Sequence, residues 1–217
     1  MRANFLFLAS FASLPLLSAA QTAPASPPFY VGVGAAVLTN IGFRTGAYSP
    51  FAPAQTLVGP ALTLGRQLSA HWSAQLGLAY GWRTVSDTTT YAGAVTTRTR
   101  TRLVTVPLLL RYTFSPAASR FHLDALGGLT LQHATSSFDF NYTDFPPSRG
   151  GTFDNSGQYT STSAHVTLGP AVRFALVPHL ELTAMPLLNV ALNKNEGDLR
   201  QRLRWNAQVG VNYLFGH

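Results

Sequence analysis

The sequence contains no cysteine, which excludes disulfide frameworks, thiolate chemistry and a lipid anchor on an N-terminal cysteine. Charged residues are also scarce: they make up 11% of the 217 residues, whereas 46% are hydrophobic. Beyond the first twenty residues, no apolar run is long enough to form a transmembrane helix. If the remaining chain crosses a membrane, it therefore does so only as a closed β-barrel.

Lysine is nearly absent as well, because Lys194 is the only one, and arginine carries the formal net charge of +7. Two explanations stay open: arginine-rich codon usage, or recognition of phosphate, which the guanidinium fork binds better than an ammonium group does. The sequence has no glycine loop that would cradle phosphate, no nucleic-acid motif and no metal-ligand spacing among its six histidines. We therefore expect no cofactor, no metal and no nucleic-acid partner.

Residues 1–20 have the three parts of a secretory signal peptide. Arg2 supplies the positive region, residues 5–17 the apolar region, and Ser18 to Ala20 the small-residue cleavage site. Residues 21–28, rich in proline, alanine and serine, are expected to form a tether. This leaves residues 29–217 as one domain, since their number suits a single one.

Residues 104–114, VTVPLLLRYTF, alternate in character with a period of two. One parity is wholly apolar, from Val104 to Phe114, while the other includes Thr105, Arg111 and Thr113. Because successive side chains of a strand point to opposite faces, this segment is a strand with one apolar and one polar side.

Further segments alternate in the same sense, with Gly, Ser, Thr, Gln and Arg on the second face. Apolar-out, polar-in strands of about ten residues are typical of transmembrane β-barrels. The predicted fold is all-β: an eight-stranded antiparallel up-and-down transmembrane β-barrel. Its strands are expected at residues 29–38, 55–67, 72–85, 98–114, 120–138, 159–175, 180–192 and 201–215.

The connections between these strands alternate between short and long. Short ones are expected at residues 68–71, 115–119 and 177–179, and long polar ones at 39–54, 86–97, 141–158 and 193–200. Short periplasmic turns and long outer loops are the rule in outer-membrane barrels, so both termini are predicted to be periplasmic. Trp72 and Trp82, ten positions apart on one face, are spaced to lie in the two aromatic girdles of such a barrel.

The segment at residues 104–114 resembles the I/V-P-L-L-L-K/R-Y-x-F strand of the outer-membrane β-barrel family that includes PorT-like small porin-family proteins. The glycine-rich residues 30–34 and the terminal residues 209–215 are similar to that family's first and last strands. The resemblance covers the mature chain and implies an outer-membrane location and contact with the outer-membrane insertion machinery. It implies no particular activity. Gly216 and His217 depart from the pattern, because they follow the terminal aromatic residue.

Four charged residues are expected inside the barrel, near its short turns. Hairpin counting pairs Arg111 with Asp124, and Arg173 and Glu181 flank the next short turn. Charges at membrane depth are expected to pair with one another. They are interpreted as salt bridges that fill the lumen; the alternative is an ion pathway or a pair of catalytic acids.

Arg98, Arg100 and Arg102 continue the outward parity of residues 104–114 and begin just above the outer girdle. Lipopolysaccharide phosphates lie at that height, and arginine binds phosphate bidentately. The alternative is a solvated strand end whose charges only keep the loop out of lipid. Both readings stay open.

The sequence thus predicts a small monomeric barrel with a structural or interaction role and no enzymatic activity, in contact with outer-membrane lipid and lipopolysaccharide. A narrow channel and a secretion-system accessory remain alternatives. A lipid A-modifying enzyme is a third, because His133, Thr135 and Ser137 share the outward face near the outer rim. No companion carboxylate is identified for them.

Overall fold

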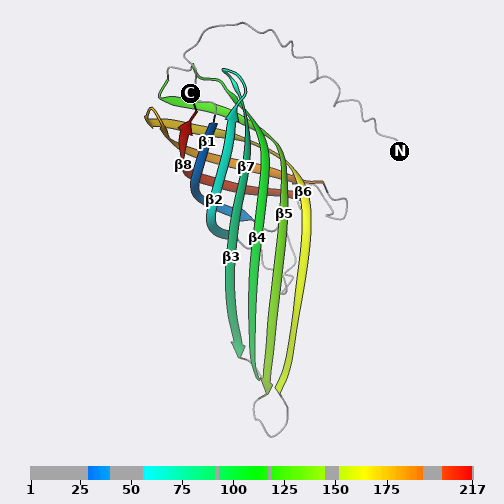
Figure 1. Cartoon of the computed structure of the whole chain (residues 1–217). Coiled ribbons are helices and arrows are strands. Elements are labelled where there is room, and N and C mark those ends of the chain that lie inside the picture. Colours follow the sequence, from blue (N-terminus) through cyan, green and yellow to red (C-terminus); the bar gives the residue numbers. More distant parts are fainter. Residues whose placement is uncertain are drawn as a thin grey trace, which may run out of the picture.

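The computed structural model describes residues 29–39, 56–90, 93–116, 119–144, 152–192 and 202–216. Eight antiparallel strands follow one another around a closed barrel, and β8 pairs with β1 to close it (Figure 1). The predicted eight-stranded antiparallel barrel is therefore confirmed. The strands are β1 (Phe29–Thr39), β2 (Thr56–Gln67), β3 (Trp72–Thr90), β4 (Gly93–Thr113), β5 (Phe121–Asp144), β6 (Thr152–Val177), β7 (Leu180–Ala191) and β8 (Leu203–Phe215).

The strands differ greatly in length. β1, β2, β7 and β8 have 11 to 13 residues each, whereas β3 to β6 have 19, 21, 24 and 26. The longer strands stay paired to their ends, as the Thr90–Ala94 and Thr143–Thr152 partners show. They leave the barrel on one side as a curved four-stranded sheet (Figure 1), which we call the projecting sheet: residues 82–90, 93–102, 135–144 and 152–160.

Two predicted loops were wrong. Residues 86–97 and 141–158 were expected to be long polar connections, but β3 and β4 extend to either side of residues 91–92, and β5 and β6 extend well into the second range. The polar residues there are mostly threonine and serine. Threonine is polar but is also enriched in β-strands, so a polar segment rich in it can still form a strand. The other long loops, at residues 40–54 and 193–200, and the predicted signal peptide and tether lie outside the described residues.

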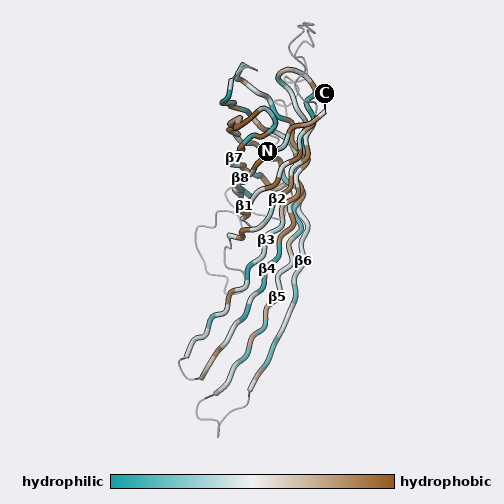
Figure 2. The backbone as a smooth tube through the Cα atoms, turned by 60° about the vertical axis from the view of Figure 1, so that its left-hand side comes forward, coloured by the Kyte–Doolittle hydropathy of each residue, from teal (hydrophilic) through white to brown (hydrophobic). Residues whose placement is uncertain are grey.

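The barrel wall is apolar outside and polar inside. Its exterior exposes leucine and valine side chains from every strand, whereas threonine, glutamine, asparagine, histidine and charged side chains are buried within. Figure 2 shows the hydrophobic residues concentrated in the barrel and largely absent from the projecting sheet. This is the reverse of a soluble protein and suits a wall surrounded by lipid. Among the described residues, no helix is long and apolar enough to span a bilayer.

The two faces exchange character where the projecting sheet begins. Tyr80, Val104, His133 and Thr162 are cross-strand neighbours, and they form the last row of the wall. Beyond this row the outward positions of β4 hold arginine, and those of β5 and β6 hold threonine, serine, glutamine and aspartate. The row therefore marks the outer limit of the apolar band.

The inward face of the projecting sheet carries aromatic side chains instead. The rings of Phe140 and Phe153 meet edge to face with centroids 6.5 Å apart. Phe138 lies over Gly157, its cross-strand partner, because a side chain at Gly157 would occupy the space of the ring. Ring packing across a glycine of this kind stabilises a sheet that lacks a second layer.

Glycine on the inner face of the shortest strands makes room for a larger neighbour. Tyr30 is opposite Gly65, and its ring fills the space that a side chain at Gly65 would take. The Tyr30 hydroxyl reaches over Gly65 and donates a hydrogen bond to Gln75 Oε1 (3.2 Å) on β3. The small inner residues of β1 and β2 are thus complementary to large side chains.

We predict that Gly65→Ala lowers the free energy of unfolding by about 1–3 kcal/mol, because the added methyl group displaces the Tyr30 ring from a packed interior. Urea titration in lipid vesicles, followed by tryptophan fluorescence, measures the change. Gly127→Ala is the matched control, since an added methyl group there meets only the end of the Leu168 side chain. Equal unfolding free energies for the two variants would contradict this packing.

Candidate functional sites

Arg173 is the centre of a buried ionic cluster at the barrel end that carries the short turns. Its guanidinium group donates to both oxygens of Asp124, with Nε–Oδ2 at 2.7 Å and Nη2–Oδ1 at 3.2 Å. It also donates to Glu181 Oε2 (3.1 Å) and to Thr113 Oγ1 (3.0 Å). One arginine from β6 thereby connects β4, β5 and β7 across the lumen.

The predicted pairing of Arg111 with Asp124 needs a correction. Phe114 N donates to Leu123 O (2.9 Å), so the hairpin places Asp124 opposite Thr113 and Arg111 opposite Leu126. The two charged groups remain diagonal neighbours, with Arg111 Nε 3.6 Å from Asp124 Oδ2. The primary partner of Asp124 is therefore Arg173, which hairpin counting along one turn could not reveal.

Arg111 has its own set of contacts deeper in the wall. Its guanidinium group donates to Gln75 Oε1 and lies 5.4 Å from the centre of the Tyr30 ring. With the side chain 1% exposed, such cation–π and amide contacts replace the water that the charge has lost. The cluster as a whole has two arginines and two carboxylates, so its formal charge is balanced.

Above the ionic cluster the lumen is filled in alternating layers. An apolar layer of Leu109, Leu126, Ala171, Met185 and Leu187 comes first. A second polar layer follows, and a second apolar cluster on the β1–β5 side closes the filling. With side chains buried at every level, the lumen resembles a protein core more than a channel.

The second polar layer contains an arginine that the sequence did not single out. Arg204 Nη1 donates to Gln132 Oε1 (3.2 Å) and lies 3.4 Å from His165 Nε2. His165 in turn contacts Ser163 Oγ at 2.8 Å. Inward parity alone marks Arg204 in the sequence, because its partners come from β5 and β6, which are distant along the chain.

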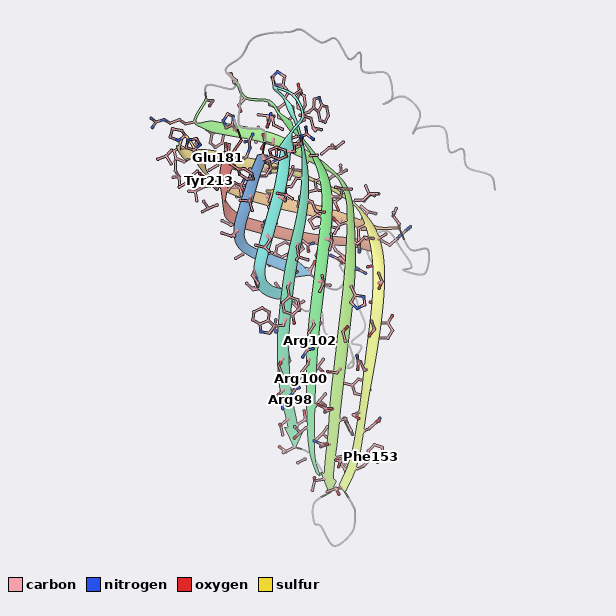
Figure 3. All side chains as sticks on the ribbon, viewed as in Figure 1. Arg98, Arg100, Arg102, Phe153, Glu181 and Tyr213 are labelled. Carbon is pink, nitrogen blue, oxygen red and sulfur yellow. The ribbon has the colours of Figure 1, made fainter. Side chains whose placement is uncertain are left out.

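The predicted outward arginines form a ladder on the outer face of β4. Arg98, Arg100 and Arg102 are exposed, while Thr99 and Thr101 between them are buried. Figure 3 shows the three arginines one after another along the projecting part of the strand. No ion pair or hydrogen bond joins their guanidinium groups to another described residue.

A groove of about 410 Å³ lies beside this ladder, between β3 and β4. The rings of Tyr80 and Trp82 stack at its barrel end, with centroids 5.5 Å apart and planes at 27°. Trp82 is the cross-strand partner of Arg102, and Thr84 is that of Arg100. The groove is lined mainly by Tyr80, Trp82, Arg83, Arg98, Arg100 and Arg102.

His133 lies on the same outer face, one row nearer the barrel. Its Nδ1 atom is 2.9 Å from Thr162 Oγ1 on β6. Across the part of the chain that the structure describes, no group of three or more histidine, cysteine, aspartate or glutamate residues could hold a metal ion. The ring thus has a hydroxyl neighbour, while the carboxylates near the ionic cluster already bind arginine.

Comparison with known proteins adds the family. A family model described as outer membrane protein beta-barrel domain matches residues 9–215. The attachment invasion locus protein Ail of Yersinia pestis has a similar structure, with a TM-score of 0.53, 14% identity and coverage of 88% of this chain and 100% of Ail. The outer membrane protein OprG of Pseudomonas aeruginosa is also similar, with a TM-score of 0.52, 14% identity and coverage of 88% of this chain and 97% of OprG. No curated protein sequence matches the chain. The narrower PorT-like resemblance stays a prediction.

We predict that Asp124→Ala lowers the free energy of unfolding by about 3–5 kcal/mol, because it leaves Arg173 and Arg111 without their shared carboxylate. In double-mutant cycles, the coupling of Asp124 with Arg173 should exceed its coupling with Arg111, since only Arg173 makes hydrogen bonds to this carboxylate. Urea unfolding of each variant in detergent supplies the values. Additive losses for Asp124 and Arg173 would rule out the cluster as described.

Proposed function

The chain belongs to the outer membrane protein beta-barrel domain family, and from that membership we propose that it is a non-enzymatic interaction barrel. In this proposal the barrel anchors the chain in the outer membrane and displays the projecting sheet outside the cell. The observation that carries it is the length of β3 to β6, which reach far past a barrel that 11 to 13 residues per strand already complete. An anchor alone would have no use for them.

The exposed edges of the projecting sheet support an interaction role. Among the residues that the structure describes, β6 loses its β7 partner after the His165–Ala191 pair, and its backbone from Thr152 to Thr162 pairs only with β5. Unpaired strand edges are places where another extended chain can add. Between these two residues there is no proline or lysine, which are the usual protections of an edge.

The proposed orientation places the projecting sheet outside and the three short turns in the periplasm. The connections at residues 68–71, 114–120 and 178–179 join strands at the barrel end opposite the sheet, and the ends of β1 and β8 pair there through Phe29 and Phe215. Both chain termini are then periplasmic, following the prediction made from loop lengths. The chain is proposed to be inserted by the outer-membrane machinery and to act as a monomer after a signal peptide at residues 1–20 is removed.

A channel is the first alternative, and the layered lumen argues against it. An ion would have to displace buried groups such as His165 and Asn189 and pass the balanced cluster around Arg173. Planar-bilayer recordings separate the two ideas, because a filled barrel should give no steady conductance steps.

A lipid-modifying enzyme is the second alternative, and it rests on His133, Thr135 and Ser137 on the outward face of β5. The histidine has Thr162 as a neighbour on the outer face, and an enzyme would need a nucleophile activated by a base that a third group orients. Mass spectrometry of lipid A incubated with the purified barrel tests this alternative, which predicts loss or transfer of an acyl chain.

The outward arginines support a second role, contact with phosphate groups of the surrounding glycolipid. The three guanidinium groups lie two residues apart on one face, so they are spaced by roughly 7 Å. This spacing allows them to bind several phosphate groups, either of one headgroup or of neighbouring ones. They begin in the first row beyond the apolar band, the level at which such headgroups lie. Lipopolysaccharide is thus proposed as a partner through Arg98, Arg100 and Arg102.

The orientation is tested by cysteine labelling, since the chain has no cysteine of its own. Cysteines introduced at Asp154, on the projecting sheet, and at Arg120, beside a short turn, should react differently with a membrane-impermeant maleimide on intact cells. We predict that only the cysteine at 154 is labelled, and that permeabilised cells label both. Labelling of both positions in intact cells would overturn the proposed orientation.

The arginine contact is tested by changing Arg98, Arg100 and Arg102 together to glutamine. We predict a folded barrel that co-purifies with less lipopolysaccharide, and an intermediate loss for the triple lysine variant, because an ammonium group cannot form the bidentate fork. A double variant of Arg66 and Arg120, exposed arginines at the opposite rim, is the control. If the triple glutamine variant keeps as much glycolipid as the parent after the same detergent wash, the ladder is only a solvated strand end.

A further inference from the structure

We propose that the groove beside the arginine ladder binds the phosphorylated sugar ring of an outer-leaflet glycolipid, with Trp82 as the surface on which the ring stacks. The inference rests on the arginine contact proposed above and names what that site recognises. Phosphate alone would be served by the three arginines. The groove adds a shape and an aromatic surface that phosphate does not require.

The aromatic and cationic parts of the groove are held in register by the sheet. Trp82 on β3 faces Arg102 on β4 as a direct cross-strand partner, with Arg100 opposite Thr84 and Arg98 opposite Ser86. Adjacent strands are about 4.8 Å apart, so a sugar ring against Trp82 has its substituents within reach of Arg102. Thr84 and Ser86 are small, and this leaves the space above them open to the arginines.

The stacked pair of rings explains why a sugar fits better than a simple anion. Trp82 is 55% exposed and lies at a shallow angle to Tyr80, so the two rings form a shelf with a free face. The C–H face of a pyranose is apolar and packs on such a face, while its hydroxyl and phosphate groups stay at the edge. The guanidinium groups then donate bidentate hydrogen bonds to the phosphate at that edge.

The position of the groove selects a membrane lipid over a soluble saccharide. Tyr80 and its partner Val104 belong to the last row of the apolar wall, so the shelf continues directly from the surface that faces acyl chains. Behind the groove, Thr101 and Leu103 are buried, so a ligand can enter only from the outer face. A glycolipid with its acyl chains along the wall therefore brings its headgroup to the shelf without leaving the membrane.

Trp72 offers an internal comparison for an ordinary interfacial tryptophan. It lies ten residues earlier on the same face of β3, at the opposite rim, where its cross-strand partner is Tyr112. Its ring packs edge to face on Tyr112 with centroids 5.0 Å apart. The two tryptophans thus differ in their cross-strand partner, which is aromatic for Trp72 and an arginine for Trp82, whose ring neighbour Tyr80 lies on its own strand.

The test measures lipid binding to the full-length protein by native mass spectrometry. Three probes are used: lipid A, phosphatidic acid as a phosphate without a sugar, and sucrose octasulfate as a soluble anionic saccharide. The variants are Trp82→Leu, Trp72→Leu as the matched control, and the triple glutamine variant of the ladder. Heat-modifiable migration on gels verifies folding, and Trp82→Thr, which is also not aromatic and suits a strand, replaces the leucine variant with the same expected outcomes if that variant does not fold.

We expect Trp82→Leu to weaken lipid A binding about threefold to tenfold while phosphatidic acid binding stays at the parent's level. Trp72→Leu should change neither, the triple glutamine variant should weaken both lipids, and sucrose octasulfate should not displace lipid A. A triple variant that keeps both lipids would overturn the arginine contact itself. Two other results would overturn only the sugar site, provided that the triple variant loses both lipids. In the first, Trp82→Leu binds lipid A as well as the parent does; in the second, Trp82→Leu loses lipid A and phosphatidic acid equally. Displacement by sucrose octasulfate would overturn the membrane source.

Discussion

Closure of the β-ladder is the constraint on which the rest of this structure depends. In lipid, an unpaired backbone N–H or C=O group costs several kcal/mol, so β1 must pair with β8 along its whole length. The seam runs from the Phe29–Phe215 pair to the Leu38–Asn206 pair. Gly34 faces Gly210 near its middle, and a side chain at either position would meet the backbone of the other strand. At this point of the seam, the close approach of β1 and β8 depends on the absence of side chains.

Closing the ring at eight strands leaves an interior that side chains can fill, and the buried residues there are too polar for a simple apolar core. The sequence resolves this by alternating layers, with charged and amide side chains at two levels and apolar side chains between them. Arg173 illustrates the cost and the compensation. A buried guanidinium group would be strongly unfavourable, but five hydrogen bonds from one side chain to Asp124, Glu181 and Thr113 replace its hydration. The filling that stabilises the barrel is also the observation on which the proposal of a barrel without a channel rests.

The period of two in the sequence was enough to predict the barrel and the face on which each residue lies, but it was not enough to predict which side chains contact one another. Parity placed Arg111, Asp124, Arg173 and Glu181 inside and Arg98 to Arg102 outside, since parity depends only on position along a strand. Partner choice depends on register across strands, and a turn that closes two residues away from the expected count moved the main partner of Asp124 from Arg111 to Arg173. Arg204 has inward parity too, but its partners lie on strands far away in the chain, so only the fold shows them.

The missed projecting sheet has a different cause. Residues 86–97 and 141–158 were interpreted as loops because they are long and polar and fit the alternation of short and long connections. Beyond the membrane the same alternation continues with the faces exchanged, and aromatic residues such as Phe140 and Phe153 point inward. The strand pattern was present throughout, and what changed was the solvent on the outer side. The row where it changes, from Tyr80 to Thr162, lies directly below Trp82 and Arg102. The sequence alternation thus sets the boundary between the apolar and the cationic surface, and at this boundary Trp82 and Arg102 are cross-strand partners, the arrangement on which the proposed glycolipid site rests.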